Sequence, residues 1–231
     1  MHDRVRLTIG HVLRHAPAAS AAGADAATID IAQDLLLRKL SNDGVLDMLA
    51  FKGGTALRKM FAGASGRFST DLDFAVTDLS ETPAAVQALV NEAVHGATIG
   101  PFRYRIAARR GRSHIVYEHD LAPTRMGLTS KLDIGPPTWL APVPRSWVPL
   151  PTHERYGGPL PQLPTVTIEE HVAEKIARLN RRTRTTLAVT RRAANWPATR
   201  DRTQVLHDVA RFPPDSSISS EKTGNNQIRT R

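Results

Sequence analysis

The chain has 231 residues and no cysteine, so disulfide bonds and thiolate zinc sites are excluded and a cytoplasmic location is expected. Its 31 Lys and Arg outnumber 22 Asp and Glu, and the formal net charge of +9 favours a polyanionic partner such as nucleic acid, although a basic surface can serve solubility alone. No stretch approaches the roughly 18 apolar residues of a membrane span, so no membrane association is expected.

Apolar residues recur at helical spacing in three segments of the first half, over residues 4–15, 28–40 and 82–94. The alanine-rich residues 16–27 are interpreted as a loop or a frayed helix end. The second helix is therefore expected to be capped by Asp25 or Thr28. The sequence Asn42-Asp43-Gly44 predicts a turn at its end.

Strands are predicted where apolar and polar residues alternate, over about residues 68–76, 102–109, 113–119 and 127–135. Prolines recur through residues 136–166, which predicts an extended connection rather than a central strand. A helix is expected to follow, with Thr167 and Glu170 as a capping box. Its buried face is expected to consist of apolar residues at helical spacing, namely Ile168, Val172, Ile176 and Leu179.

These elements divide the chain into four expected parts. They are an α/β core domain over residues 1–135, a Pro-rich connection over 136–166, a helical C-terminal region over 167–212 and a disordered tail over 213–231.

Two aspartates lie one residue apart on the first predicted strand. Phe68, Leu72, Phe74 and Val76 share one parity, so Ser69, Asp71 and Asp73 project together from the other face. Carboxylates at this spacing can share a divalent cation, and hard oxygen ligands suit Mg²⁺ or Mn²⁺. On the strand over residues 127–135, Asp133 faces the same way as Thr129 and Lys131. If the two strands are neighbours, Asp133 completes the trio used in two-metal phosphoryl transfer.

A Gly-Gly-Thr turn precedes the first strand. Gly53 and Gly54 let the backbone approach a ligand closely, and Thr55 starts a helix whose free N–H groups favour an anion. Taken alone, an Asp-x-Asp pair is more often a solvated strand face, and a Gly-Gly pair is more often only a turn. The conjunction of the turn, the pair and the later aspartate is more specific, and it predicts a nucleoside triphosphate site.

The order GGT, then Asp71-Leu72-Asp73, then Asp133 resembles the DNA polymerase β-like nucleotidyltransferase superfamily. The segments FKGGTALRK, FSTDLDF, KLDI and EEHVAEKIARL are similar to AbiEii/AbiGii-type toxin nucleotidyltransferases, the toxin halves of bacterial toxin–antitoxin pairs. The resemblance extends over roughly residues 35–184. It implies an α/β (α+β) polymerase β-like core, with a small mixed sheet flanked by helices, and a helical C-terminal region.

The resemblance also implies an activity, namely Mg²⁺- or Mn²⁺-dependent transfer of NMP from an NTP. In some members the acceptor is the 3′ end of tRNA, and the partners implied are tRNA or another RNA and a cognate antitoxin. The phosphate-binding residues implied are Lys52, Gly53, Gly54, Thr55 and Lys175. The catalytic residues implied are Ser69, Asp71, Asp73, Asp133 and Lys175, with the three aspartates as metal ligands. The residues that suit RNA phosphates are Arg103, Arg105, Arg109, Arg181 and Arg182.

The C-terminal part departs from the family pattern. Members usually follow the Glu-Lys helix with a helix that opens on an Arg-Asp pair and carries a second Asp. Here the pair Arg200-Asp201 comes late and Trp196-Pro197 intervenes. Either an insertion has displaced this element or the C-terminal end is altered. The rival hypothesis is therefore a catalytically impaired member that binds nucleotide, RNA or an antitoxin, and a protein hydroxyl is a third possible acceptor.

Overall fold

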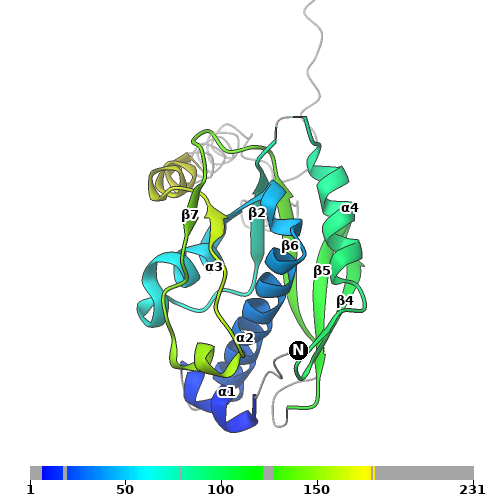
Figure 1. Ribbon diagram of the computed structural model, residues 1–231, viewed down its shortest axis with the longest axis vertical. Helices are drawn as coiled ribbons and strands as arrows, with labels where there is room; N and C mark the ends of the chain where they lie inside the picture. The colour runs from blue at the N-terminus through cyan, green and yellow to red at the C-terminus, as the bar shows by residue number, and fades with distance from the viewer. Residues whose placement is uncertain (1–6, 18–19, 79, 122–126, 178, 180–231) are drawn as a thin grey trace, which may run out of the picture. The chain divides into compact units, whose positions relative to one another are not determined.

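An eight-stranded mixed sheet forms the centre of the computed structural model, which describes residues 7–17, 20–78, 80–121, 127–177 and 179 (Figure 1). The strands lie in the order β3-β4-β5-β6-β2-β1-β8-β7. Their bounds are β1 Leu49–Lys52, β2 Leu72–Val76, β3 Thr98–Ile99, β4 Phe102–Arg109, β5 Arg112–His119, β6 Leu128–Gly135, β7 Val143–Arg145 and β8 Leu163–Thr165. Two pairs are parallel, β2 with β6 and β1 with β8, and the other neighbours are antiparallel. The predicted α/β fold with a mixed sheet is confirmed.

The helices fall between these strands. The α-helices are α1 Ile9–His15, α2 Ala21–Asn42, α3 Gly53–Leu57 and α4 Pro83–Val94. Shorter helical turns are η1 Val45–Met48, η2 Arg58–Ala62, η3 Gly63–Ser65 and η4 Pro151–Arg155, of which η2 is a π-helix. A further helix begins at residue 168 and is described to residue 177. None of the helices in the described part of the chain is long and apolar enough to cross a membrane.

Helix α2 begins earlier than expected. It starts at Ala21, where the Ser20 hydroxyl accepts a hydrogen bond from the N–H of Gly23 at 3.1 Å. The expected caps Asp25 and Thr28 are wrong, because both residues lie inside the helix. Alanine has the highest helix propensity, and residues 21–27 of the alanine-rich stretch form the first two turns of α2 instead of a loop or a frayed end.

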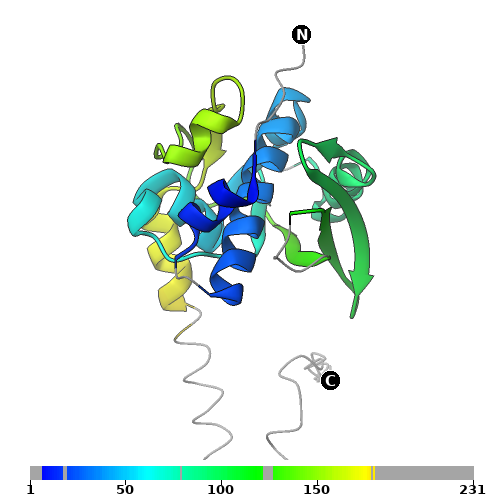
Figure 2. The ribbon, with the colours of Figure 1, turned by 90° about the horizontal axis from the view of Figure 1, so that it is seen from below.

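Helices α2 and α4 cover one face of the sheet (Figures 1 and 2). Leu72, Phe74 and Val76 of β2 are buried in the main core under these helices. On the neighbouring strands, the Tyr104 hydroxyl donates to the Ala32 carbonyl of α2 at 2.8 Å, and Gln33 of α2 donates to the Ser130 hydroxyl at 3.1 Å. Residues of the opposite parity therefore lie on the other face, which we call the open face.

The Pro-rich residues 136–166 were expected to form only an extended connection, but they also contribute strands β7 and β8. The N–H of Val166 donates to the Phe51 carbonyl at 3.0 Å, which attaches this segment to β1. Prolines are accommodated because Pro164 is level with Pro144 of β7, and β7 is the edge of the sheet. This segment belongs to the same compact unit as the core, and that unit ends at Glu174.

The helix that begins at residue 168 is oriented differently from the expectation. The Thr167 hydroxyl accepts the N–H of Glu170 at 3.4 Å. The Glu170 carboxylate, however, accepts the N–H groups of Trp139 and Leu140, each at 3.0 Å, instead of the N–H of Thr167.

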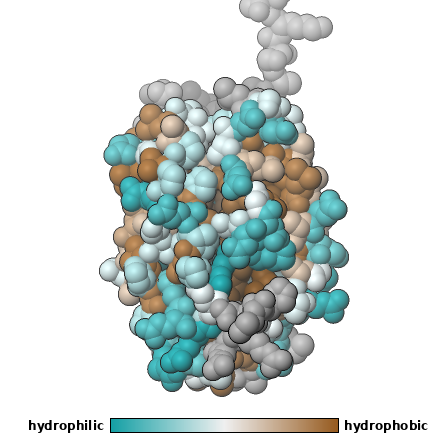
Figure 3. Space-filling view, viewed as in Figure 1, coloured by the Kyte–Doolittle hydropathy of each residue, from teal (hydrophilic) through white to brown (hydrophobic). Residues whose placement is uncertain are grey.

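The expected buried apolar face of this helix is wrong. Glu170 and His171 are the buried residues, whereas the four expected core residues are exposed, from Ile168 at 38% to Leu179 at 62%. Hydrophobic atoms are visible at the upper left of Figure 3, where Figure 1 draws the start of this helix. The rest of the expected helical region, residues 180–212, and the expected tail over 213–231 lie outside the described residues.

Candidate active site

Two of the three predicted aspartates are cross-strand neighbours on the open face, and the third directly precedes β2. Strand β6 is the parallel neighbour of β2, and Asp133 is level with Asp73. Asp71 directly precedes β2 and shares the parity of Asp73. Asp133 was predicted to join Asp71 and Asp73 if the two strands are neighbours, and β6 and β2 are neighbours. Asp73 is half-buried, while Asp71 and Asp133 are exposed.

The Gly-Gly turn packs directly against this face. Lys52, the last residue of β1, is level with Asp73. Gly53 has φ +78°, and a Cβ added to it would lie 2.2 Å from Oδ2 of Asp73. A Cβ on Gly54 would lie 2.9 Å from Oγ of Ser69. Both glycines are therefore needed for the close approach of the turn to Ser69 and Asp73.

Thr55 is fully buried, and its hydroxyl donates to the main-chain carbonyl of Asp71. The helix begins at Gly53 and not at Thr55 as expected. Thr55 thus ties the turn to the start of β2, and direct contact of its side chain with phosphate stays a prediction. The backbone N–H groups at the start of α3 are the groups that favour an anion.

Replacing Gly53 by alanine tests this contact. We expect Gly53→Ala to lower the free energy of unfolding by about 2 kcal/mol or more, because the left-handed backbone costs about 1–2 kcal/mol and the new methyl group displaces Asp73. Gly96→Ala is the matched control, since Gly96 has φ +81° and nothing within 4 Å of its added Cβ. Urea unfolding of both variants measures the difference; equal losses would contradict the contact.

Two lysines accompany the aspartates. Lys131 Nζ lies 2.8 Å from Oδ2 of Asp133, and Lys52 forms an ion pair with Glu174. Among the described residues, no three Asp, Glu or His side chains lie close enough together to hold a metal ion without rearrangement. Hard carboxylate oxygens on one strand face nevertheless fit Mg²⁺ or Mn²⁺ chemically. Asp71, Asp73 and Asp133 would be its ligands.

A buried ionic network, which the sequence interpretation did not include, connects α2 with η2, the π-helix that follows the turn and α3 in the chain. Asp30 and Asp34 of α2 are at most 1% exposed, and they bind Arg58 and Lys59 of η2. The Lys59 ammonium lies 2.8 Å from Oδ1 of Asp30, and Arg58 Nη2 lies 3.0 Å from Oδ2. A sequence signal existed, because two aspartates four residues apart interrupt the apolar run of α2.

This network shifts the pKa values of Asp30 and Lys59. Burial alone would raise the pKa of Asp30, but Lys59, the hydrogen bond from His15 and the Arg58 guanidinium together hold it far below its ordinary value. Burial would lower the pKa of Lys59, yet Asp30 and Asp34 raise it. The Asp30 carboxylate and the Lys59 ammonium therefore stay charged at neutral pH, and their ion pair holds η2 against α2.

The other predicted residues are placed as follows. Arg103, Arg105 and Arg109 are exposed on β4, whereas Arg181 and Arg182 lie outside the described residues. Lys175 is the first residue of the second unit, which begins directly after Glu174. Its contact with a triphosphate stays a prediction.

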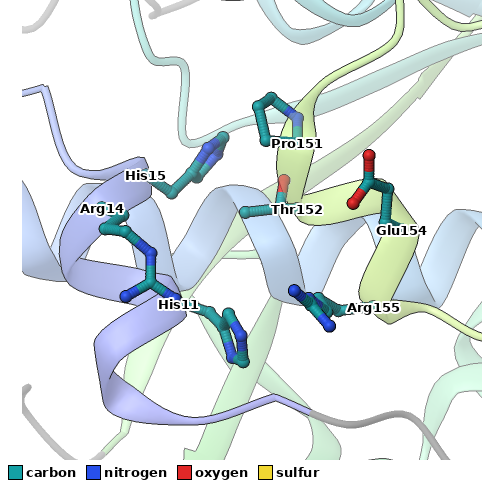
Figure 4. A pocket seen from close by; sticks show the side chains of 7 residues that line it. All are labelled: His11, Arg14, His15, Pro151, Thr152, Glu154 and Arg155. Carbon is teal, nitrogen blue, oxygen red and sulfur yellow. The ribbon is translucent and has the colours of Figure 1, made fainter.

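A cavity of about 430 Å³ lies elsewhere, between α1 and η4 (Figure 4). It is lined by His11, Arg14, His15, Pro151, Thr152, Glu154 and Arg155, and it contains none of the predicted site residues. Burial, with the nearby charges of Arg14 and Arg155, lowers the pKa of His11. The candidate active site is therefore the open sheet face and not this cavity.

A glycine turn packed on a strand that carries two aspartates, with a third on the parallel neighbour, is the arrangement that a nucleotidyltransferase needs. Residues 34–196 match the family model described as nucleotidyl transferase AbiEii toxin of a type IV toxin–antitoxin system. The chain belongs to this family, and the resemblance inferred from its sequence is confirmed.

Among solved structures, the chain is similar to MenT4, a nucleotidyltransferase toxin from Mycobacterium tuberculosis H37Rv. The two share 36% sequence identity with a TM-score of 0.63. The match covers 75% of this chain and 59% of MenT4, so the chain spans somewhat under two thirds of that relative. No curated protein sequence matches.

Proposed function

We propose that this chain is a nucleotidyltransferase that transfers NMP from an NTP to an RNA acceptor, the 3′ end of tRNA, and thereby blocks translation as the toxin of a type IV toxin–antitoxin pair. The observation that carries the proposal is the contact of the Gly53-Gly54 turn with Ser69 and Asp73, on the face that also presents Asp133. Family membership supports the class of reaction. A cytoplasmic location and a cognate antitoxin belong to the same proposal.

Each group has a distinct task in this reaction. The backbone N–H groups of the turn bind the donor phosphates, and Lys52 balances their charge. Family membership supports the same role for Lys175. Bound Mg²⁺ or Mn²⁺ supplies charge neutralisation of the transferred phosphoryl group. Asp71, Asp73 and Asp133 would hold the divalent ions, and Ser69 contacts the turn next to these aspartates.

The bond changes follow from these positions. The acceptor hydroxyl attacks the α-phosphorus, and the bond between that phosphorus and the pyrophosphate oxygen breaks. Asp133 accepts the hydroxyl proton, and pyrophosphate leaves on the side of the turn. NMP is thereby joined to the RNA by a phosphodiester bond, and pyrophosphate is released.

The direct test incubates the protein with each α-³²P-labelled NTP, Mg²⁺ and total tRNA, and follows the label on denaturing gels. We expect label on tRNA that depends on Mg²⁺ and disappears with Asp71→Ala. No label transfer from any NTP, or transfer undiminished by Asp71→Ala, would contradict the proposal. Label on protein instead of RNA would reassign the acceptor to a protein hydroxyl.

A second candidate is a catalytically impaired member that binds nucleotide, RNA or an antitoxin. The displaced Arg-Asp pair beyond Arg184 favours it, since that element differs from the family pattern. Growth of the host on expression separates the two candidates. Growth arrest that requires Asp71 and Asp73 supports the enzyme, whereas harmless expression with tRNA binding retained supports the binding module.

A further inference from the structure

Charged residues follow a fixed order across the open face of the sheet. Lys52 on β1 is level with Asp73 on β2, which is level with Asp133 on β6. On the far side of β6, Ser113 pairs with Leu132, so Arg112 comes level with Asp133 one residue further on. These cross-strand neighbours form one row across the sheet. The row runs from Lys52, next to the Gly53-Gly54 turn, through Asp73 and Asp133 to Arg112 on β5.

Two arginines at the end of this row, Arg112 on β5 and Arg109 on β4, lie on the open face. Ile115 and Tyr117 of β5 are buried on the helix-covered face, so Arg112, at even spacing from His114 and Val116, lies on the opposite face. Arg109 on β4 is the cross-strand partner of Arg112 and shares its face. Since neighbouring strands are about 4.8 Å apart, Arg112 and Arg109 stand about 10 and 14 Å from Asp73 across the sheet.

The tip of this hairpin carries a third arginine in a strained backbone conformation. Arg110 and Gly111 form the two-residue turn between β4 and β5, with φ +51° and +70°. Arg110 is the non-glycine residue with positive φ in the described part of the chain. Such turns favour Asn-Gly, so arginine at this position costs stability. The green hairpin projects at one side of the sheet in Figure 2.

We infer that this end of the open face, with Arg109, Arg110 and Arg112, binds the phosphate backbone of the acceptor RNA, on the opposite side of the aspartates from the phosphate turn. The inference rests on the proposed transfer reaction. In that reaction the attacking hydroxyl and the leaving pyrophosphate must lie on opposite sides of the phosphorus. Because the pyrophosphate belongs to the turn beside β1, the acceptor approaches over β5 and β4.

The same geometry separates these residues from the other arginines of β4. Arg105 Nε lies 3.2 Å from the Glu118 carboxylate, which offsets part of its charge. Arg103 is level with Glu118 and lies six residues from Arg109. Arg103 and Arg105 also lie farther along β4 from the row of aspartates than Arg109 does, so we expect them to contribute less to RNA binding than the hairpin tip.

Fluorescence anisotropy of labelled total tRNA, titrated with Asp73→Asn protein, measures binding without turnover. Added to this background, Arg109→Ser with Arg112→Ser should weaken binding about tenfold and reduce the slope of log K against log salt by about 1 to 2. Arg14→Ser with Arg155→Ser is the matched control, because these exposed arginines line the cavity between α1 and η4. The control should keep the affinity and the slope of its parent.

Arg110→Asn keeps the test valid if the double variant unfolds. Asparagine suits the turn, so we expect Tm to rise by about 2–4 °C while tRNA binding weakens about threefold. Unchanged tRNA binding in both hairpin variants, or an equal loss in the Arg14 and Arg155 control, would overturn the inference. Absence of label transfer by the wild type would instead reject the proposed function, because the anisotropy measurement uses inactive protein throughout.

Discussion

Asp73→Asn is expected to reduce NMP transfer about 10³-fold or more while leaving the fold intact. Asp73 is level with both Lys52 and Asp133, and it contacts the turn at Gly53, so it is the central carboxylate of the open face. Asparagine keeps the size of the side chain but removes the negative charge that binds a divalent cation. A loss of that size corresponds to about 4 kcal/mol of transition-state stabilisation. Label transfer at saturating NTP and tRNA measures the effect.

The dependence of Tm on cation concentration distinguishes the loss of a metal-binding carboxylate from unfolding of the variant. Because Mg²⁺ or Mn²⁺ binds the folded chain, the Tm of the wild type should rise with the concentration of the cation, and that of Asp73→Asn should not. Asp47→Asn is the control, since Asp47 is an exposed aspartate of η1. A cation response retained by Asp73→Asn, or lost by the control, would contradict the assignment of Asp73 as a ligand.

Lys59→Met is expected to lower the free energy of unfolding by about 3–5 kcal/mol. The substitution leaves Asp30 and Asp34 buried with one cation fewer, and an uncompensated buried charge carries a penalty of this order. Urea unfolding followed by circular dichroism measures it. Lys39→Met is the control, because Lys39 and Asp43 form an ion pair at the surface, where such pairs contribute about 1 kcal/mol or less. Equal effects of the two substitutions would contradict the role of burial.

The same network makes stability depend on pH in a defined direction. The pKa of Asp30 lies below its unfolded value, so Asp30 stabilises the fold fully above about pH 4 and loses this contribution as the pH falls. The pKa of Lys59 is raised, so its contribution is complete below about pH 10 and declines above its folded pKa. Stability over the neutral range should thus be insensitive to these two groups.

Strand parity made the central part of the site predictable. Alternation predicted a strand over residues 68–76, whereas β2 covers only Leu72–Val76. Strand geometry therefore places Asp73 on the open face, and the common face of Ser69 and Asp71, which precede the strand, stays a prediction. The neighbourhood of β6 and β2 could only be assumed, since pairing depends on the whole sheet. The same limit explains why the buried partners of Arg58 and Lys59, which lie about 28 residues earlier in α2, were not identified.

Local rules failed where tertiary packing decided the outcome. Proline frequency argued against strands in residues 136–166, yet Pro144 and Pro164 are level with each other on β7 and β8. Helical spacing predicted that Ile168 and Val172 would be buried, whereas hydrogen bonds to Trp139 and Leu140 turn Glu170 inward. In each case a partner that is distant in the sequence determines which polar groups form hydrogen bonds and which side chains are exposed.

The position of β8 has a consequence for synthesis of the chain. Strand β1, which ends at the phosphate turn, pairs with β2 on one side and with β8 on the other. More than a hundred residues separate β1 from β8, so the second edge of β1 stays open until Leu163–Thr165 have left the ribosome. A nascent or truncated chain that ends before them presents Phe51 on an unprotected strand edge, which is a template for aggregation.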